Sequence, residues 1–175
     1  TAIGRDPAGV VRTMARVAER AESEAAYRQW ANRLGRVQRT DHHEQMSSID
    51  PLTAALTHAA SLAAIDADVS AILCCTRSGR TARAMARFRP AARLIGLSPH
   101  PPVVRSLALR WGSETVEVDI YGSTDEMVGF AVESALGAGL IDRGDTVLVL
   151  AGAPDHDRRR PADAATDVLR IVRVD

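Results

Sequence analysis

The feature that most constrains this sequence is an uninterrupted apolar run, Ala71–Cys75, which is followed at once by a polar loop. The run is short for a helix, and a strand with this pattern would be apolar on both of its faces. Such strands are typical of parallel sheets that are covered on both sides by helices. The run therefore predicts an α/β fold in which this strand is central.

The loop that follows the run combines three hydroxyl side chains, one glycine and two arginines where a helix must begin. The first turn of a helix leaves backbone N–H groups without partners and carries about half a positive charge. We therefore expect an anion site here, with phosphate as its ligand. The candidate residues are Thr76, Arg77, Ser78, Gly79, Arg80 and Thr81.

The same loop also has a purely structural interpretation. Ser78 or Thr81 would cap the helix, and Gly79 would permit the turn. The full glycine-rich pattern of nucleotide phosphate loops is absent. The loop alone therefore leaves both interpretations open.

Helical and strand patterns alternate along the chain. Helices are predicted at 7–30, after the cap Asp6, then from 51, after the cap Ser48 or Asp50, from about 82, at 103–111 and from the cap Ser123. Strands are predicted at 71–75, 93–97, 115–120, 146–150 and 168–174. This order predicts a three-layer α/β sandwich with a five-stranded, mostly parallel sheet, an antiparallel last strand and helices on both faces.

The predicted sheet also locates a ligand site. Such sheets bind ligands beyond the carboxyl ends of their strands. The loop at 76–81 and the loop after residue 150 both lie there. They meet only if the first and fourth strands are neighbours.

Charge and cysteine usage restrict the possible functions. The formal net charge is zero, which gives no support for binding to nucleic acid or to a membrane. All 22 basic residues are arginine, so no lysine is available as a nucleophile or as a partner for phosphate. Cys74 and Cys75 are neighbours that point to opposite faces of a strand, so we expect unbonded thiols in the cytoplasm. No apolar run approaches the length of about 20 residues that a membrane span needs.

Three stretches carry a resemblance to one family. Thr76, Ser78, Gly79, Arg80, Thr81 and Ala82 match the pattern T-x-S-G-R-[ST]-A, with which the strand, loop and helix resemble the pyruvate kinase C-terminal domain. Residues 1–7 resemble the segment T-A-x-G-x-[YD]-P that closes the catalytic barrel of that family. Residues 144–152 and 166–172 resemble the end of the family's sequence. The resemblance implies that the loop at 76–81 binds a phosphate of an allosteric effector, a sugar phosphate or a nucleotide.

The resemblance also implies a domain organisation. Residues 1–34 would be the last helix of the catalytic barrel, 35–48 a linker, and 49–175 the C-terminal effector and oligomerisation domain. Since the chain opens with Thr1, we expect a piece of a longer protein. Its partners would be the barrel domain and further copies of the chain, in a dimer or tetramer.

The family's chemistry would then lie outside this chain. Catalytic residues, magnesium and potassium are expected in the barrel that precedes residue 1. We therefore expect no catalytic residue, no cofactor and no metal site here, and no turnover by the chain alone. The neighbouring His42 and His43 are interpreted as solvated, because no second ligand cluster has zinc spacing.

The sequence departs from the family at the second half of the effector site. Met127 stands where effector-binding members place an arginine, so the second phosphate contact of a bisphosphate is missing from the pattern. A second effector loop containing Gly152, Arg158, Arg159 and Arg160 is the candidate replacement. In the structural alternative, these arginines simply face solvent.

Two other functions remain open. The chain would be a stand-alone α/β module that binds a phosphorylated metabolite or mediates assembly, or a nucleotide-dependent enzyme that uses Ser78 or Asp125. The absence of G-x-G-x-x-G weighs against the enzyme. A preceding barrel with a lysine and paired acidic residues would decide for the pyruvate kinase interpretation.

Overall fold

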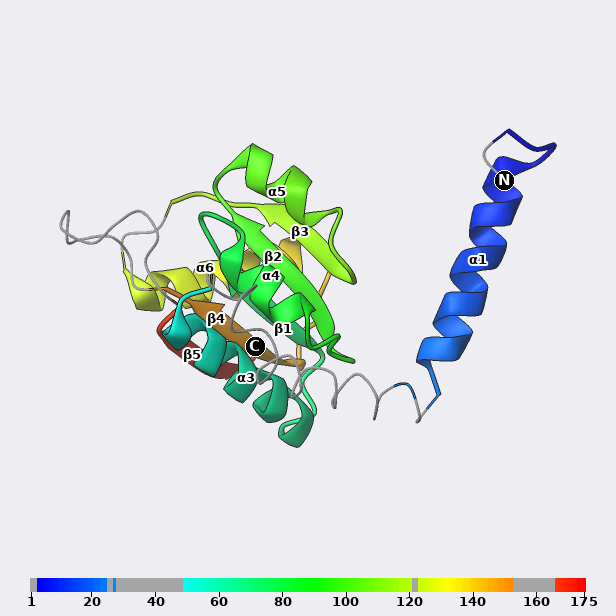
Figure 1. The fold of residues 1–175 in the computed structure, drawn as a ribbon. Helices are drawn as coiled ribbons and strands as arrows, with labels where there is room; N and C mark the ends of the chain where they lie inside the picture. Colours follow the sequence, from blue (N-terminus) through cyan, green and yellow to red (C-terminus); the bar gives the residue numbers. More distant parts are fainter. Residues whose placement is uncertain (1–2, 25–26, 28–48, 121–122, 153–165) are drawn as a thin grey trace.

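The strands form one five-stranded sheet in the order β3-β2-β1-β4-β5 (Figure 1). The computed structural model describes residues 3–24, 27, 49–120, 123–152 and 166–175. The strand bounds are β1 Ala71–Cys75, β2 Arg93–Ser98, β3 Ser113–Glu117, β4 Thr146–Ala151 and β5 Val168–Arg173. The sheet thus has the predicted number of strands, with the apolar run at its centre.

Strand pairing confirms the predicted topology. β1 runs parallel to both of its neighbours, and Cys74 is in register with Gly96 of β2 and with Leu150 of β4. β5 pairs antiparallel with β4, as its alternating pattern predicts. The first and fourth strands in sequence are therefore neighbours, which is the condition for the two predicted ligand loops to meet.

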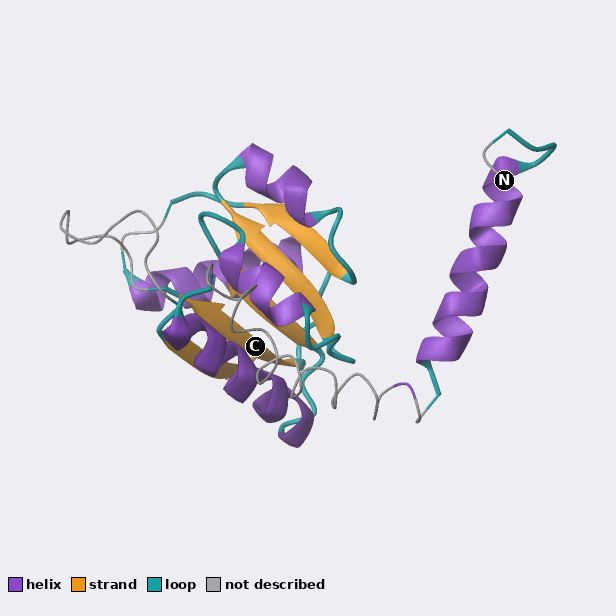
Figure 2. Cartoon of the chain, viewed as in Figure 1, coloured by secondary structure: helices purple, strands orange, loops and turns teal. Residues whose placement is uncertain are grey.

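Helices cover both faces of the sheet, which completes the predicted three layers (Figure 2). One apolar layer lies under α3 (Pro51–Asp66), α4 (Arg80–Ala86) and α5 (Pro101–Leu107). The opposite layer lies under α6 (Thr124–Gly137). Cys74 belongs to the first layer and Cys75 to the second, so the two adjacent thiols do point to opposite faces.

Small residues let the helices approach the sheet closely. Gly96 lies where β2 passes beneath α4 and α5. A Cβ atom at Gly96 would stand 2.8 Å from Cδ1 of Leu107 and 3.6 Å from Cβ of Ala82. The first of these distances is too short for a real contact, so the packing of α5 on the sheet depends on glycine at this position.

Three helices begin as the sequence predicts. The Asp6 carboxylate accepts from the Gly9 N–H (2.8 Å), and the Asp50 carboxylate accepts from the N–H groups of Leu52 and Thr53 (2.8 and 3.1 Å). The Ser123 hydroxyl accepts from the Glu126 N–H at 3.2 Å. Each cap satisfies N–H groups that the first turn leaves open.

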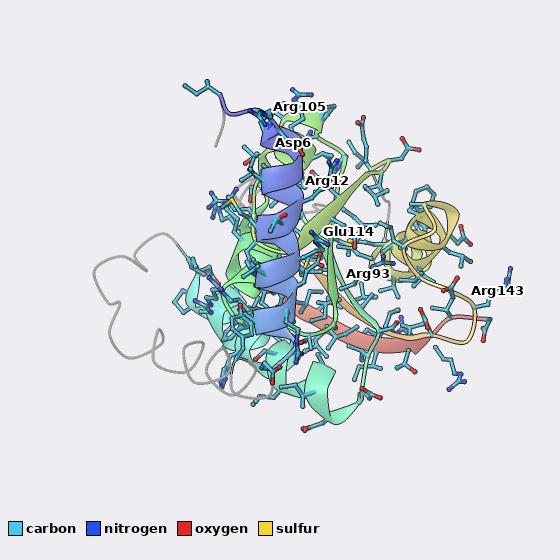
Figure 3. All side chains as sticks on the ribbon, turned by 90° about the vertical axis from the view of Figure 1, so that its right-hand side faces the viewer. Asp6, Arg12, Arg93, Arg105, Glu114 and Arg143 are labelled. Carbon is cyan, nitrogen blue, oxygen red and sulfur yellow. The ribbon has the colours of Figure 1, made fainter. Side chains whose placement is uncertain are left out.

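Several predicted boundaries were wrong. α1 spans Pro7–Glu22 and ends there, where the Ser23 hydroxyl donates to the Arg20 carbonyl and competes with the helical pattern; residues 25–26 and 28–30 of the predicted helix lie outside the described part of the chain. The helix predicted at 103–111 begins at the prolines and ends at Leu107. The strand predicted at 115–120 is Ser113–Glu117, since pairing with β2 starts directly after Gly112. A salt bridge of 2.9 Å between Arg93 and Glu114 joins these two strands (Figure 3).

α1 stands apart from the sheet in Figure 1, and none of its residues is buried. Its apolar side chains Val11, Met14 and Val17 are each more than 60% exposed. Its last residue contacts the α/β layers: Oε1 of Glu22 accepts from the Trp111 indole N–H at 3.3 Å. Arg89, which follows α4, lies over the Trp111 ring, 5.5 Å from its centroid.

The two buried thiols generate a prediction on pH dependence. Burial raises the pKa of Cys74 and also that of Cys75, the latter from 9.0 to about 12. Above pH 9 the unfolded chain therefore loses these protons before the folded chain does, and the free energy of unfolding should fall as pH rises toward 12. The slope is at most about 1.4 kcal/mol per pH unit for each thiol.

Urea unfolding at pH 8, 9, 10 and 11 measures this slope. The matched control is the double variant Cys74→Ala/Cys75→Ala, whose stability should decline less steeply over the same range. Equal slopes for the two proteins would contradict the prediction, whatever the difference in their absolute stability.

Candidate functional site

Thr76, the first residue of the candidate loop at 76–81, makes a hydrogen bond at each end of the loop's turn. Thr76 is buried, and its N–H donates to the Leu97 carbonyl of β2 at 2.9 Å, which extends the sheet pairing by one residue. Its hydroxyl oxygen accepts from the Gly79 N–H at 2.9 Å. The threonine thus holds the loop at both ends, and the chain turns sharply from β1 into α4.

Gly79 starts α4 in a conformation that favours glycine. Its φ is +79°, and no side chain caps the helix, so the expectation that Ser78 or Thr81 caps it was wrong. A Cβ atom at Gly79 would lie 2.9 Å from Nη1 of Arg83 and 3.3 Å from the side chain of Leu107. Both the backbone conformation and the space therefore require glycine here.

Thr81 makes a contact that local sequence does not predict. Its hydroxyl lies 2.7 Å from the hydroxyl of Thr166, the residue that precedes Asp167 and β5. The Thr166 N–H in turn donates to the hydroxyl of Thr53 in α3, at 3.0 Å. The site therefore includes two residues that sequence analysis did not select. Both are buried threonines, and no local pattern in the sequence distinguishes them.

Positive charge gathers at the start of α4. Arg77 is exposed and Arg80 is half-buried. Arg83 donates to the Ser78 carbonyl at 2.9 Å. Burial lowers the pKa of Arg83, and the charges of Arg110 and Arg80 lower it further. The guanidinium groups of Arg80, Arg83 and Arg110 therefore lie near enough to one another to interact, and such a concentration of positive charge favours an anionic ligand.

The second predicted loop is described only where it begins. β4 ends at Ala151, and Gly152 follows it, half-buried, at the same edge of the sheet as Thr76. Arg158, Arg159 and Arg160 lie outside the described residues, as do His42 and His43. Met127 is only 5% exposed and belongs to the apolar layer under α6.

The other reactive side chains of the described residues are either dispersed or buried. Within the described part of the chain, no three His, Cys, Asp or Glu side chains gather into a group that could hold a metal ion. The two cysteines are buried, and their raised pKa values keep the thiols protonated. None of the described helices has the length and apolar character needed to cross a bilayer.

Comparison with known proteins gives a consistent result. Residues 54–172 match the family model of the pyruvate kinase alpha/beta domain. The chain is 34% identical over 98% of its length to a pyruvate kinase of Clostridium acetobutylicum, and 36% identical over 88% to one of Geobacillus stearothermophilus. A pyruvate kinase of Clostridium perfringens is 29% identical over 99% of the chain.

The chain spans only part of these relatives. It covers 33% and 34% of the two clostridial proteins and 24% of the Geobacillus protein. The matched region contains the central strand, the loop at 76–81, Thr166 and most of β5. The chain therefore belongs to the pyruvate kinase family, and its residues 54–172 are the alpha/beta domain of that family.

Proposed function

We propose that this chain is the regulatory and oligomer-forming part of a pyruvate kinase and that residues 76–81 bind a phosphate group of an effector. The loop's position carries this proposal. It leaves the central strand at the carboxyl edge of the sheet, where parallel sheets bind their ligands. Arg77, Arg80 and Arg83, which lie in the loop or against it, support an anionic ligand.

The hydroxyl groups of the loop suit a phosphate. A phosphate dianion has only acceptor oxygens, so the protein must supply donors. Thr76 accepts from Gly79 and so keeps its own proton to donate. The Ser78 hydroxyl makes no hydrogen bond within the described part of the chain, which leaves it to the ligand. A sugar phosphate or a nucleotide fits this chemistry, and we assign the second phosphate of a bisphosphate to Gly152, Arg158, Arg159 and Arg160.

The relatives suggest what the intact protein does. We propose that it transfers phosphate from phosphoenolpyruvate to ADP in the cytoplasm, with its catalytic residues, magnesium and potassium in a barrel domain. α1 would be the last helix of that barrel, joined by a linker at 35–48 to the effector domain. The exposed apolar side chains of α1 support this assignment, because a helix of this kind needs a partner to cover it.

An exposed apolar face supports the proposed self-association. The sheet side of α3 carries its buried residues, whereas Leu52, Leu62 and Ile65 on its outer side are between 40% and 55% exposed. β5 lies next to this helix and is an edge strand of the sheet, with Ile171 43% exposed. Apolar patches and open edges of this kind favour association with a second copy.

A stand-alone binding or assembly module is the second candidate. The α/β layers have an apolar core on each face of the sheet, which is what an independently folding unit needs. Both candidates share the phosphate site. They differ in whether a catalytic barrel belongs to the same protein.

The phosphate site is tested by Ser78→Asp. The new carboxylate repels phosphate and removes a donor, so affinity should fall about tenfold to 100-fold, the range of one charge-assisted hydrogen bond. NMR titration of the labelled chain with inorganic phosphate and with glucose 6-phosphate measures this through the Gly79 amide. The control is Ser70→Asp, which adds the same charge at the opposite edge of the sheet. If titration moves other amides and leaves Gly79 unchanged, the site is elsewhere.

The association surface is tested by Leu62→Glu. We expect the chain to self-associate at tens of micromolar (the order of a weak interface), and a charge in the centre of the apolar face should weaken this at least about tenfold. Light scattering over a concentration series measures it. The control is Leu109→Glu, which changes a leucine that is 89% exposed and lies outside this apolar face. It should leave the association unchanged. A monomeric parent chain would contradict the proposal.

Activity tests the assignment of the catalytic residues to the barrel. The purified chain should not transfer phosphate from phosphoenolpyruvate to ADP, whereas the same segment within a full-length enzyme should. A lactate dehydrogenase-coupled assay measures both. Turnover that scales with chain concentration and survives repurification would show that this segment contains catalytic residues.

A further inference from the structure

The contact between Thr81 and Thr166 joins two threonine hydroxyls that are 85 residues apart in the sequence. Both side chains are buried, with exposed fractions of 6% and 2%. At an oxygen–oxygen distance of 2.7 Å, one hydroxyl donates its proton and the other accepts it. The pair therefore retains one further proton that it can donate elsewhere, and the direction of the shared bond decides which threonine offers it.

Thr166 is held in place independently of the loop at 76–81. Its N–H donates to the Thr53 hydroxyl of α3 at 3.0 Å, and the next N–H, of Asp167, donates to the Ala151 carbonyl at 3.1 Å. One bond fixes the residue to a helix, and the other fixes its neighbour to the end of β4. The Thr166 hydroxyl is thus a fixed group against which Thr81 can be oriented.

We propose that Thr166 is a positioning residue for the phosphate site: its hydroxyl donates to Thr81, so that Thr81 turns its own proton toward the ligand. This rests on the proposed phosphate binding at residues 76–81. Thr81 lies in the first turn of α4, two residues after Gly79, and so belongs to that loop. Thr166 itself contacts no ligand in this arrangement and acts only through Thr81.

The direction of the shared bond matters because phosphate oxygens only accept. If Thr81 donated to Thr166, its oxygen would present lone pairs to the phosphate and repel it. If Thr166 donates, the Thr81 oxygen is satisfied as an acceptor and its proton remains for the ligand. A hydroxyl can either donate or accept a hydrogen bond. With Thr166 fixed as the donor, the Thr81 hydroxyl is left to donate to the ligand.

A double-mutant cycle on the full chain tests this role. Inorganic phosphate and glucose 6-phosphate are titrated into the labelled parent chain, Thr166→Val, Thr81→Val and the double variant, with the Gly79 amide as readout. Thr166→Val should weaken binding about threefold to tenfold, the range of one neutral hydrogen bond. Thr166→Ser keeps the hydroxyl and should bind within about twofold of the parent.

The cycle separates positioning from a structural role. Since Thr166 acts through Thr81, adding Thr166→Val to Thr81→Val should cause no further loss. Thr57 is a buried threonine of α3 whose hydroxyl donates to the Thr53 carbonyl and not to Thr81 or Thr166. Thr57→Val therefore controls for general destabilisation and should leave phosphate affinity unchanged. The cycle is repeated with Thr166→Ala in place of Thr166→Val. A folding defect in one of the two Thr166 variants then does not decide the result.

Two results would overturn the positioning role while phosphate binding at the loop stands. In one, Thr166→Val binds as the parent does. In the other, Thr166→Val weakens binding by the same factor with and without Thr81. A parent chain whose Gly79 amide responds to neither probe would instead refute the proposed phosphate site, and the role of Thr166 with it.

Discussion

The whole arrangement depends on burying β1 from every side. This strand is paired with β2 on one side and with β4 on the other, and apolar layers cover both of its faces. The chain can leave the core only beyond the carboxyl end of this strand. The polar residues that follow Cys75 must therefore reach the surface between the ends of β2 and β4. The place of the candidate loop is therefore a consequence of how the core is built.

Sequence patterns predicted the parts of the fold that depend on local hydrophobicity. The run Ala71–Cys75, the alternation in β5 and the caps Asp6, Asp50 and Ser123 each have a local signal, and the structure confirms them. Element ends were less predictable, because β3 begins where pairing with β2 begins and not where its own valines lie.

The candidate site was also predictable only in part, because some of its contacts form only in the folded protein. Thr76, Ser78 and Thr81 stood out as hydroxyls at a helix start, but the capping role expected for Ser78 or Thr81 was wrong. The hydroxyl of Thr81 instead contacts a residue that follows β4 in the chain, and that contact exists only once the sheet has formed. Thr53 and Thr166 carry no local signal, since their partners come together through the tertiary fold.

The exclusive use of arginine has a consequence for how this loop responds to its surroundings. Residues 76–81 contain hydroxyls, glycine and arginine, and they include no histidine, the side chain whose charge changes near neutral pH. A guanidinium keeps its charge over the whole range in which proteins are studied. The loop itself therefore contributes no ionisation between pH 5 and 8, whereas a ligand of the proposed kind, a phosphate group, loses its second proton near pH 6.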